Sequence, residues 1–295
     1  METTVGGMLR AWRHSRRLSQ LDLALAADVS PRHVSLVETG RSRPSADMVL
    51  RLATHLDVPL RHRNRLLVAA GFAPRYRERP LDEPDMAAVR AAVARVLRAH
   101  EPYPAVVVDR SWNIVLVNAP VERLVTGVDP ALLRAPVNMV RLGLDPRGLA
   151  PLMVNLPEVR AYLRARLVRQ AARSGDQETV ALLDAYFPGD APDAPGGPFP
   201  RQEPEVATSM IFRLGDRELR LFSTVTTFGT PQDITLEEIS VESYYPADDD
   251  SAALLHDLAA APRPPRGPSF PRSLLVGHDG TREPAARPPR RTAPG

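Results

Sequence analysis

Apolar residues recur at helical spacing through the first seventy residues of the chain. Ser30 and Ser45 precede two of these runs as N-caps, and Pro31 occupies a first helical position, where its missing N–H costs nothing. Gly71 is placed to end the last run. The spacing predicts five short helices: over 6–17, after Gln20, after Ser30, over 45–58 and over 59–72. Such helices form one small all-α domain, with Leu23, Ala24, Val34 and Val37 facing its core.

The pattern changes after residue 72. A Pro-punctuated connector (73–84) leads to a helix over 86–100, and period-2 alternation then begins. We expect a strand, turn and strand over 105–118, helices near 120–125, 136–143, 148–152, 157–173 and 176–185, and strands over 206–214, 217–228 and 234–245. The predicted organisation is a helical domain (1–72), a connector and linker helix (73–103), an α+β domain with an antiparallel sheet (104–250) and a Pro/Arg-rich disordered tail (251–295).

Composition narrows the class of protein. The chain has no cysteine, which excludes disulfides and thiolate metal sites and fits a reducing cytoplasm, where we expect the protein to act. It contains no run of 18 apolar residues, so a membrane span is not expected. All 38 basic residues are Arg. The exclusive use of Arg indicates a codon bias. An Arg at any one position is therefore weak evidence that Arg, rather than Lys, is required there.

Charge is unevenly distributed along the chain. Residues 1–80 carry +7, residues 81–261 carry −9 and residues 262–295 carry +5. A basic helical domain suits the phosphates of nucleic acid, whereas the acidic middle does not.

The run from Arg16 to Ser45 predicts two helices joined by a tight turn, the second able to enter a DNA major groove. It resembles the Xre/lambda-repressor-like helix-turn-helix family. The matching residues are Leu18-Ser19-Gln20, Leu23-Ala24, Val29-Ser30, Val34-Ser35, Val37-Glu38, Gly40-Arg41 and Pro44-Ser45. Asp28 stands where the family usually has Gly. Asp tolerates the left-handed conformation better than most residues, so we expect the turn to be preserved.

The DNA contacts separate into two kinds. Arg32 and His33, in the first turn after Ser30, are the expected base readers, with Leu36 placed for a thymine methyl group. The residues expected to contact DNA are Gln20, Ser30, Arg32, His33, Ser35, Leu36, Arg41 and Arg43. Within this set, the Gln20 backbone N–H, Arg41 and Arg43 face phosphates, and Ser35 faces a phosphate or a base edge. The resemblance implies that Glu38 is structural and pairs within the domain, with Arg10 or Arg17 as the expected partner.

The chain as a whole resembles the MmyB-like transcription regulators. The similarity rests on residues 69–93, 99–118, 138–149 and 222–248. It implies an Xre-like DNA-binding domain before a PAS-like domain that accepts fatty-acid-like molecules. Partners are therefore expected to be double-stranded DNA, a small apolar molecule and a second copy of the chain. A pocket of ~300–1,000 Å³ is the size such a molecule requires.

The expected lining of that pocket comes from inward strand positions and one polar helical position. These residues are Val106, Val108, Leu116, Arg141, Met210, Phe212, Phe222, Thr224 and Thr226. Asn138 and Arg141 have two open roles: anchoring a polar head group, or capping and bracing helices, which we favour.

The sequence contains little that indicates catalysis, so we predict that the protein is not an enzyme and has no cofactor. The sequence has no G-x-S-x-G, H-E-x-x-H or P-loop motif, and its seven His lack metal-ligand spacing. Glu237, Glu238 and Glu242 lie on one predicted strand, with Glu238 and Glu242 on one face, and an acid–base role for them has little support. Three functions stay open: a ligand-responsive regulator, a ligand-independent regulator whose acidic half serves dimerisation or partner binding, and an enzyme that uses a PAS-like cavity.

Overall fold

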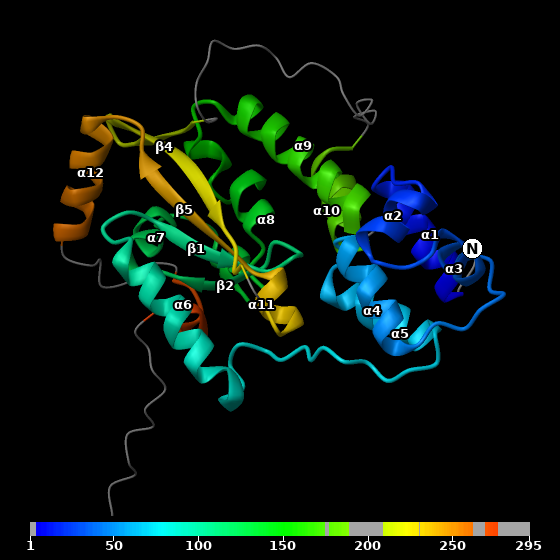
Figure 1. The fold of residues 1–295 in the computed structure, drawn as a ribbon. Coiled ribbons are helices and arrows are strands. Elements are labelled where there is room, and N and C mark those ends of the chain that lie inside the picture. The colour runs from blue at the N-terminus through cyan, green and yellow to red at the C-terminus, as the bar shows by residue number, and fades with distance from the viewer. Residues whose placement is uncertain (1–3, 175–176, 189–208, 230, 262–268, 277–295) are drawn as a thin grey trace, which may run out of the picture. The chain divides into compact units, whose positions relative to one another are not determined.

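The computed structural model describes residues 4–174, 177–188, 209–229, 231–261 and 269–276 (Figure 1). The chain divides into two compact units. The first holds residues 1–90 together with 227–239, and the second holds 91–226 and 240–295. Each unit is considered by itself below.

The first unit contains the five expected helices, α1 (Val5–Ser15), α2 (Gln20–Ala26), α3 (Pro31–Glu38), α4 (Ala46–His55) and α5 (Leu60–Ala69). Ser19, Ser30 and Ser45 cap α2, α3 and α4, each accepting a hydrogen bond from the backbone N–H of the third residue of its helix. One core holds them together, and the expected inward positions Leu23, Ala24, Val34 and Val37 are all buried in it.

The turn between α2 and α3 is preserved despite the substitution of Asp for Gly. Asp28 has a φ of 51°, in the left-handed region. The chain reverses there, and the Val29 N–H donates to the Ala24 carbonyl at 2.9 Å. The local geometry of a helix-turn-helix is therefore reached without glycine.

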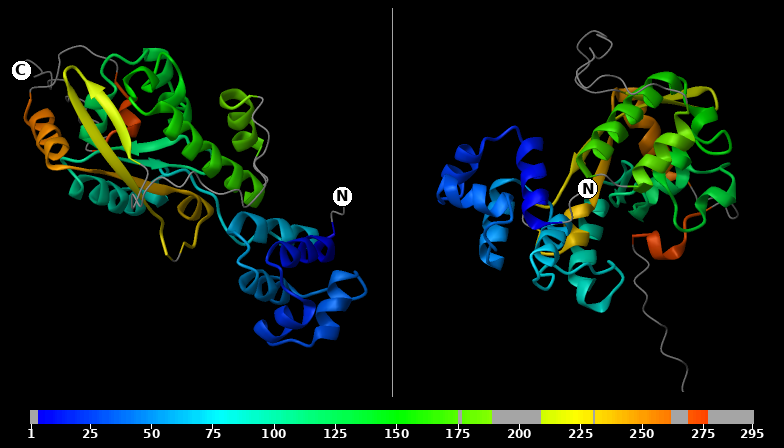
Figure 2. Two further views of the ribbon diagram at one scale, coloured as in Figure 1. Left: turned by 90° about the horizontal axis from the view of Figure 1, so that it is seen from above. Right: turned by 90° about the vertical axis from the view of Figure 1, so that its right-hand side faces the viewer.

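The second unit is built on a five-stranded sheet in the order β2-β1-β5-β4-β3 (Figure 2). The strands are β1 (Ala105–Val108), β2 (Ile114–Val117), β3 (Met210–Leu214), β4 (Arg217–Thr226) and β5 (Ser240–Pro246). Every neighbouring pair is antiparallel. Strands β1 and β2 form the opening hairpin, helices α7 (Ala119–Leu124) to α10 (Gln177–Tyr186) follow, and β3–β5 come after them, as the PAS-like expectation requires.

Helices α7 (Ala119–Leu124), α8 (Met139–Leu144) and α9 (Leu156–Ser174) lie against one face of this sheet. Helix α10 (Gln177–Tyr186) packs on α9, and α6 (Ala87–Ala99) precedes β1. Four short 3₁₀ turns complete the described elements: η1 (Pro84–Met86), η2 (Pro130–Leu133), η3 (Ala150–Leu152) and η4 (Arg272–Leu274).

Two expectations about secondary structure are wrong. The stretch 234–245 is not one strand: α11 (Ile234–Glu238) comes first and β5 follows. Glu237 and Glu238 therefore lie on a helix, and only Glu242 is on a strand.

The chain is also ordered beyond residue 250, where a disordered tail was expected. Helix α12 (Asp249–Ala260) packs on β4 and β5 through the buried Leu254 and Leu255. Phe270 is buried with the core around β1 and β2, and Leu275 bridges to Val117. The expectation for 262–268 and 277–295 lies outside the described residues.

Candidate functional site

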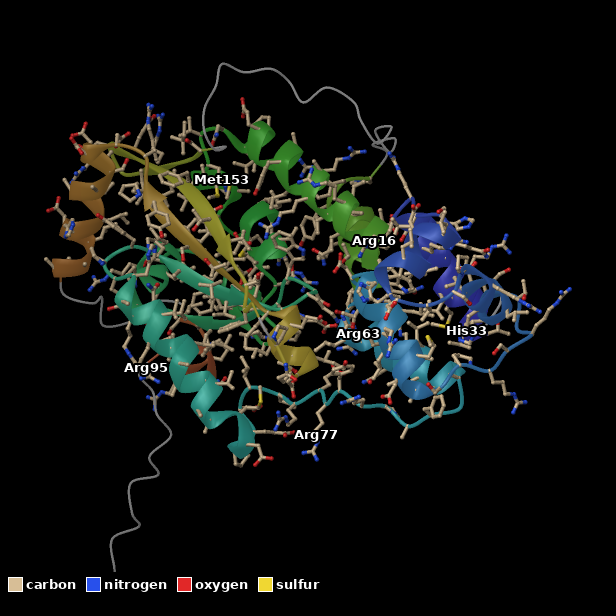
Figure 3. All side chains as sticks on the ribbon, viewed as in Figure 1. Arg16, His33, Arg63, Arg77, Arg95 and Met153 are labelled. Atoms are coloured by element: carbon tan, nitrogen blue, oxygen red, sulfur yellow. The ribbon has the colours of Figure 1, made fainter. Side chains whose placement is uncertain are left out.

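The outward face of α3 carries the expected base-reading residues. Arg32 is exposed, and His33, Ser35 and Leu36 are half-exposed, while Val34 and Val37 anchor the opposite side in the core. Figure 3 labels His33 among the helices of this domain. The Ser30 hydroxyl accepts the His33 N–H at 3.1 Å, so its oxygen serves the helix cap. Pro31 at the first helical position leaves no N–H unpaired there. The structure thus presents a rigid, capped helix whose first turn displays Arg32 and His33.

Arg41 and Arg43 follow α3 and are both exposed. Gly40, with a φ of 71°, turns the chain out of the helix, and the Arg41 N–H donates to the Leu36 carbonyl at 2.9 Å. This turn fixes the backbone that carries the two guanidinium groups after the end of α3.

Glu38 pairs with Arg13, so the expected partners, Arg10 and Arg17, are wrong. The Arg13 Nε and Nη2 atoms donate to the two carboxylate oxygens of Glu38 at 2.7 and 2.9 Å, and both side chains are almost fully buried. Arg13 lies on the buried side of α1, whereas Arg17 has left the helix with a φ of 57°. Burial opposes the charge, but the hydrogen bonds from Arg13 and Gln20 hold the pKa of Glu38 below its ordinary value.

The side chain of Gln20 is also part of this cluster. Its Nε2 donates to Glu38 at 2.8 Å. Gln20 is the first residue of α2, whose Ser19–Asp22 capping box leaves the Gln20 backbone N–H at the positive end of the helix. The phosphate contact proposed for that N–H is compatible with this arrangement.

Two other arginines of the basic unit serve its own backbone. Arg16 donates to the Leu56 and Asp57 carbonyls at 3.0 and 2.9 Å, and Arg63 donates to the Val58 carbonyl at 2.7 Å (Figure 3). These carbonyls end α4 and begin the following loop, where helical partners are missing. Arg16 and Arg63 therefore brace the end of α4, unlike the exposed Arg32, Arg41 and Arg43 on and after α3.

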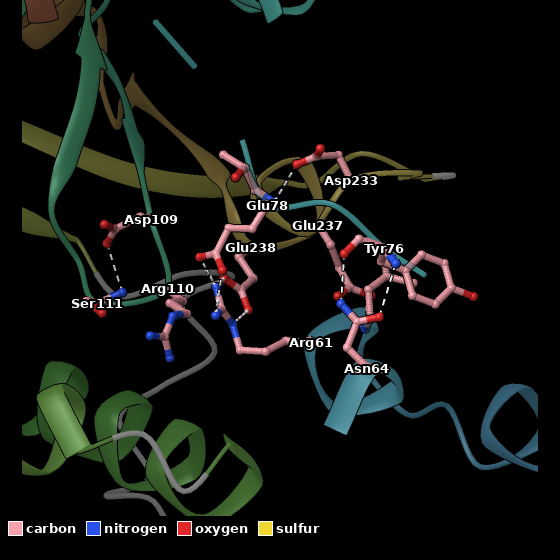
Figure 4. A network of polar contacts seen from close by, with 12 residues as sticks. Arg61, Asn64, Tyr76, Glu78, Asp109, Arg110, Ser111, Asp233, Glu237 and Glu238 are labelled. Carbon is pink, nitrogen blue, oxygen red and sulfur yellow. Dashed lines mark hydrogen bonds and ion pairs between the residues drawn. The ribbon is translucent and has the colours of Figure 1, made fainter. Parts of the chain in front are cut away.

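The β4–β5 segment (residues 227–239) belongs to the first unit because it packs on α5. Helix α5 begins after Pro59, which offers no side-chain cap, and Glu237 takes that place by accepting the Leu60 N–H at 2.7 Å. Arg61 then donates to both oxygens of Glu238, at 2.7 and 2.8 Å, and also pairs with Glu78 (Figure 4). These hydrogen bonds, from Glu238 first and Glu78 second, raise the pKa of Arg61.

The connector after α5 is held both by α5 and by the same segment. The Asn64 side chain accepts from the Arg75 and Tyr76 N–H groups and donates to the Tyr76 carbonyl at 2.7 Å (Figure 4). Further on, Arg79 donates to the buried Asp233 carboxylate at 2.8 Å, and Asp233 also caps α11. Sequence reasoning missed this docking because its partners are 154 and 177 residues apart.

Within the second unit, a pocket of about 120 Å³ lies between the sheet and helices α7–α9. Its wall is mostly aliphatic and includes three methionines, Met139, Met153 and Met210. The volume is below the ~300–1,000 Å³ expected for a drug-sized ligand, but near that of the ~150 Å³ apolar cavities that bind benzene. Methionine side chains are unbranched and flexible, so this wall can yield to a longer molecule.

Three of the nine residues expected to line the pocket do so: Val106, Met210 and Phe212. The residues of strand β4 that face the pocket are the ones expected on its opposite face. Leu221 and Ser223 line the pocket, whereas Phe222 stacks on Tyr245 on the opposite face, at 5.4 Å between ring centroids. Thr224 and Thr226 are exposed.

The remaining three expected lining residues are also displaced. Val108 is buried in the neighbouring core, and Leu116 pairs with Val107 rather than with the pocket-lining Val106. Arg141 is exposed on α8. Asn138 caps that helix by accepting the Val140 and Arg141 N–H groups, which agrees with the capping role favoured for Asn138.

The polar part of the pocket wall consists of residues that sequence reasoning did not assign to it. Arg166 on α9 forms an ion pair with Glu242 on β5, and its guanidinium carbon lies 4.4 Å from the ring centroid of Trp112. Although burial opposes it, the Glu242 contact raises the pKa of Arg166. Ser223, Tyr162 and Tyr244 complete the polar lining. The available signal was Glu242 itself, a carboxylate near the middle of a strand.

Among the described residues, no cluster of His, Asp and Glu is suited to hold a metal ion. The helices in that same part of the chain are each too short or too polar to cross a membrane.

Comparison with known proteins agrees with the two-unit organisation. Residues 9–62 match a helix-turn-helix family, and residues 89–258 match the family described as the MmyB-like transcription regulator ligand binding domain. No curated protein matches the chain. A solved structure entitled "Structure of an RNA-binding Light-Oxygen-Voltage Receptor" aligns with 88% of this chain and 64% of its own, at 13% identity and a TM-score of 0.26, too low to support any inference. The ligand-binding match covers more than half of the chain, and the protein therefore belongs to the MmyB-like transcription regulators, with a DNA-binding helix-turn-helix domain and a ligand-binding domain.

Proposed function

We propose that this regulator binds a specific double-stranded DNA site as a homodimer, and that a small apolar, fatty-acid-like molecule controls this binding. The observation that carries the proposal is the presence, in one chain, of a capped helix displaying Arg32 and His33 and of an apolar pocket in the ligand-binding domain. The first supplies base readout and the second a place for an apolar molecule.

Specific recognition is assigned to α3. Residues in the first turn of a recognition helix meet base edges, and Arg pairs well with the O6 and N7 atoms of guanine. Arg41 and Arg43 supply phosphate contacts that set the register. A selected-oligonucleotide experiment with the full chain tests this. We expect an enriched two-fold motif with half-sites ~10 bp apart. Recovery of random sequence would contradict the proposal.

Ligand control needs a route from the pocket to the DNA-binding helices, and we assign it to the β4–β5 segment. Ser223 on β4 and Glu242 on β5 line the pocket. The segment between these strands caps α5 through Glu237 and holds Arg61 through Glu238. A ligand that shifts either strand acts on α5 through continuous backbone. Helix α6, which runs from the first unit into the second, is the rival route.

The ligand-independent regulator is the second candidate, and the small pocket volume favours it. Native mass spectrometry of the full chain separates the two. A co-purified or added apolar molecule, retained at one per chain, supports ligand control. Failure of every apolar probe to bind would leave a regulator whose acidic half serves dimerisation or a protein partner.

A further inference from the structure

We propose that the pocket selects an acyl chain with an uncharged, carbonyl-bearing head, such as an ester or amide, over a free carboxylate. This inference rests on the proposed ligand-binding function and specifies the ligand class. It follows from the charges of the pocket wall, from the fixed position of its carboxylate and from one weakly satisfied donor.

The pocket is already electrically balanced. Arg166 and Glu242 are the charged residues among the described lining residues, and they pair with each other. An incoming carboxylate would make the wall net negative in apolar surroundings, where an uncompensated charge is costly. An uncharged head leaves the pair intact.

Neither member of the pair is placed to move aside. The Glu242 side chain is 2% exposed, and β5 lies between β1 and β4, opposite Val106 and Val225. Arg166 is held against the ring of Trp112, whose Nε1 donates to Gln170 at 2.9 Å. A free acid would therefore have to share Arg166 with Glu242, two like charges close together.

A donor suited to a carbonyl lies beside the pair. The Tyr244 hydroxyl donates to the Met139 sulfur at 3.7 Å, and a thioether is a weak acceptor. An ester or amide carbonyl is a better one, so exchange of sulfur for carbonyl favours binding. Ser223, the cross-strand neighbour of Tyr244, also lines the pocket and offers a second hydroxyl. Burial, together with the charge of Glu242, raises the pKa of Tyr244, which keeps its hydroxyl protonated as a donor.

The test compares four probes of equal chain length on the full protein: decanoic acid, methyl decanoate, decanamide and decane. Affinities are measured at pH 7.5 by displacement of a fluorescent apolar dye. We expect the ester and amide to bind at least ~10-fold more tightly than the acid, because only the acid adds a buried charge. Decane reports the contribution of the chain alone.

Two variants assign the preference to residues. Glu242→Gln removes the resident anion and should improve acid binding by ~10-fold or more, bringing it to or above that of the ester. Tyr244→Phe should weaken ester and amide by ~5-fold and leave decane unchanged. Thr224→Ala, on the exposed face of β4, is the matched control with no expected effect. Circular dichroism confirms that each variant is folded.

The outcomes separate this inference from the proposed function. If decanoic acid binds the wild-type protein more tightly than its ester and amide, the head-group inference is overturned while ligand binding stands. If ester and amide are preferred equally in wild type and Tyr244→Phe, the role of the hydroxyl is wrong. If none of the four probes binds, ligand binding itself fails and the inference falls with it.

Discussion

Under the proposed function, Arg32 on α3 determines which DNA sequence is bound, and Arg41 after α3 adds affinity for any sequence. Arg32 is exposed in the first helical turn, and Arg41 is exposed beyond the turn at Gly40. Both are arginines with the same charge and similar exposure. Comparing an alanine variant of each therefore tests the effect of position while the change in charge stays the same.

Arg32→Ala should cost ~1–3 kcal/mol at the selected site and relax base preference at one position, because a bidentate contact to guanine is lost. The measurement is a titration of the selected site and its single-base variants at constant salt. An equal loss on every sequence would show that Arg32 contacts phosphate instead.

Arg41→Ala should weaken binding to all sequences alike. Loss of one phosphate contact reduces counterion release, so the slope of log K against log salt should become shallower by ~1. Titration at several salt concentrations measures the slope. An unchanged slope, together with altered base preference, would exchange the roles assigned to Arg41 and Arg32.

Glu38 is predicted to make the helical domain sensitive to acid. Its pKa in the folded protein is lowered, so its stabilising effect is fully present above the ordinary glutamate value of ~4.3 and is lost as the pH falls through the lower folded value. The Glu38→Gln variant leaves Arg13 buried without its partner and should cost ~3 kcal/mol near pH 7. The difference in unfolding free energy between wild type and variant should shrink below pH 4, as urea titrations at each pH would record. A difference independent of pH would contradict this account.

Individual helices and strands differ in how far the sequence predicts them. The caps of α2, α3 and α4 are formed by serines three residues from their partners, so a local pattern is enough to predict these helices. The local sequence also contains the orientation of β4. The charged Glu218 and Arg220 alternate with the buried Leu219 and Leu221 and fix the inward face, and Phe222 keeps this alternation as an apolar residue on the outward face.

Contacts between distant elements could not be predicted in the same way. Arg61 and Glu238 are 177 residues apart, and Arg166 and Glu242 are 76 residues apart. In neither pair does the local sequence around one residue indicate which distant residue it contacts. The docking of the β4–β5 segment on α5 and the polar wall of the pocket both depend on such pairs, which is why the sequence identified neither.

The β4–β5 segment supplies a prediction at the level of elements. Arg61→Met removes the bidentate contact with Glu238 and should leave operator affinity without ligand nearly unchanged, because Arg61 lies on α5, outside the residues to which we assign DNA contacts. The effect of ligand on operator affinity should be reduced or lost. Operator titrations with and without methyl decanoate measure both quantities.

Arg65→Met is the matched control, because Arg65 is exposed one turn further along the same helix. It should retain the full ligand effect. Full ligand response in Arg61→Met and in a second variant, Glu238→Gln, would exclude this route and direct attention to α6.

The whole chain combines a basic N-terminal segment with an acidic middle segment. Residues 1–80 carry +7, whereas residues 81–261 carry −9. The acidic part repels DNA, so binding should depend on the helical domain and on how two copies of the chain present it. We predict two chains per operator, which sedimentation or native mass spectrometry of the complex would establish. One chain per operator would contradict the homodimer.

Ligand binding in the pocket and operator binding by the helical domain should be coupled, and thermodynamic linkage requires this coupling to be reciprocal. If a saturating neutral acyl ligand changes operator affinity by some factor, saturating operator must change the affinity of the ligand by the same factor. A ligand that binds both states equally shifts nothing, however tight its binding. We expect a factor of ~5–150, the usual range for coupled sites, measured in one direction by operator titration and in the other by dye displacement. Tight ligand binding with a factor of one in both directions would show that the pocket binds ligand and that this binding does not change operator affinity.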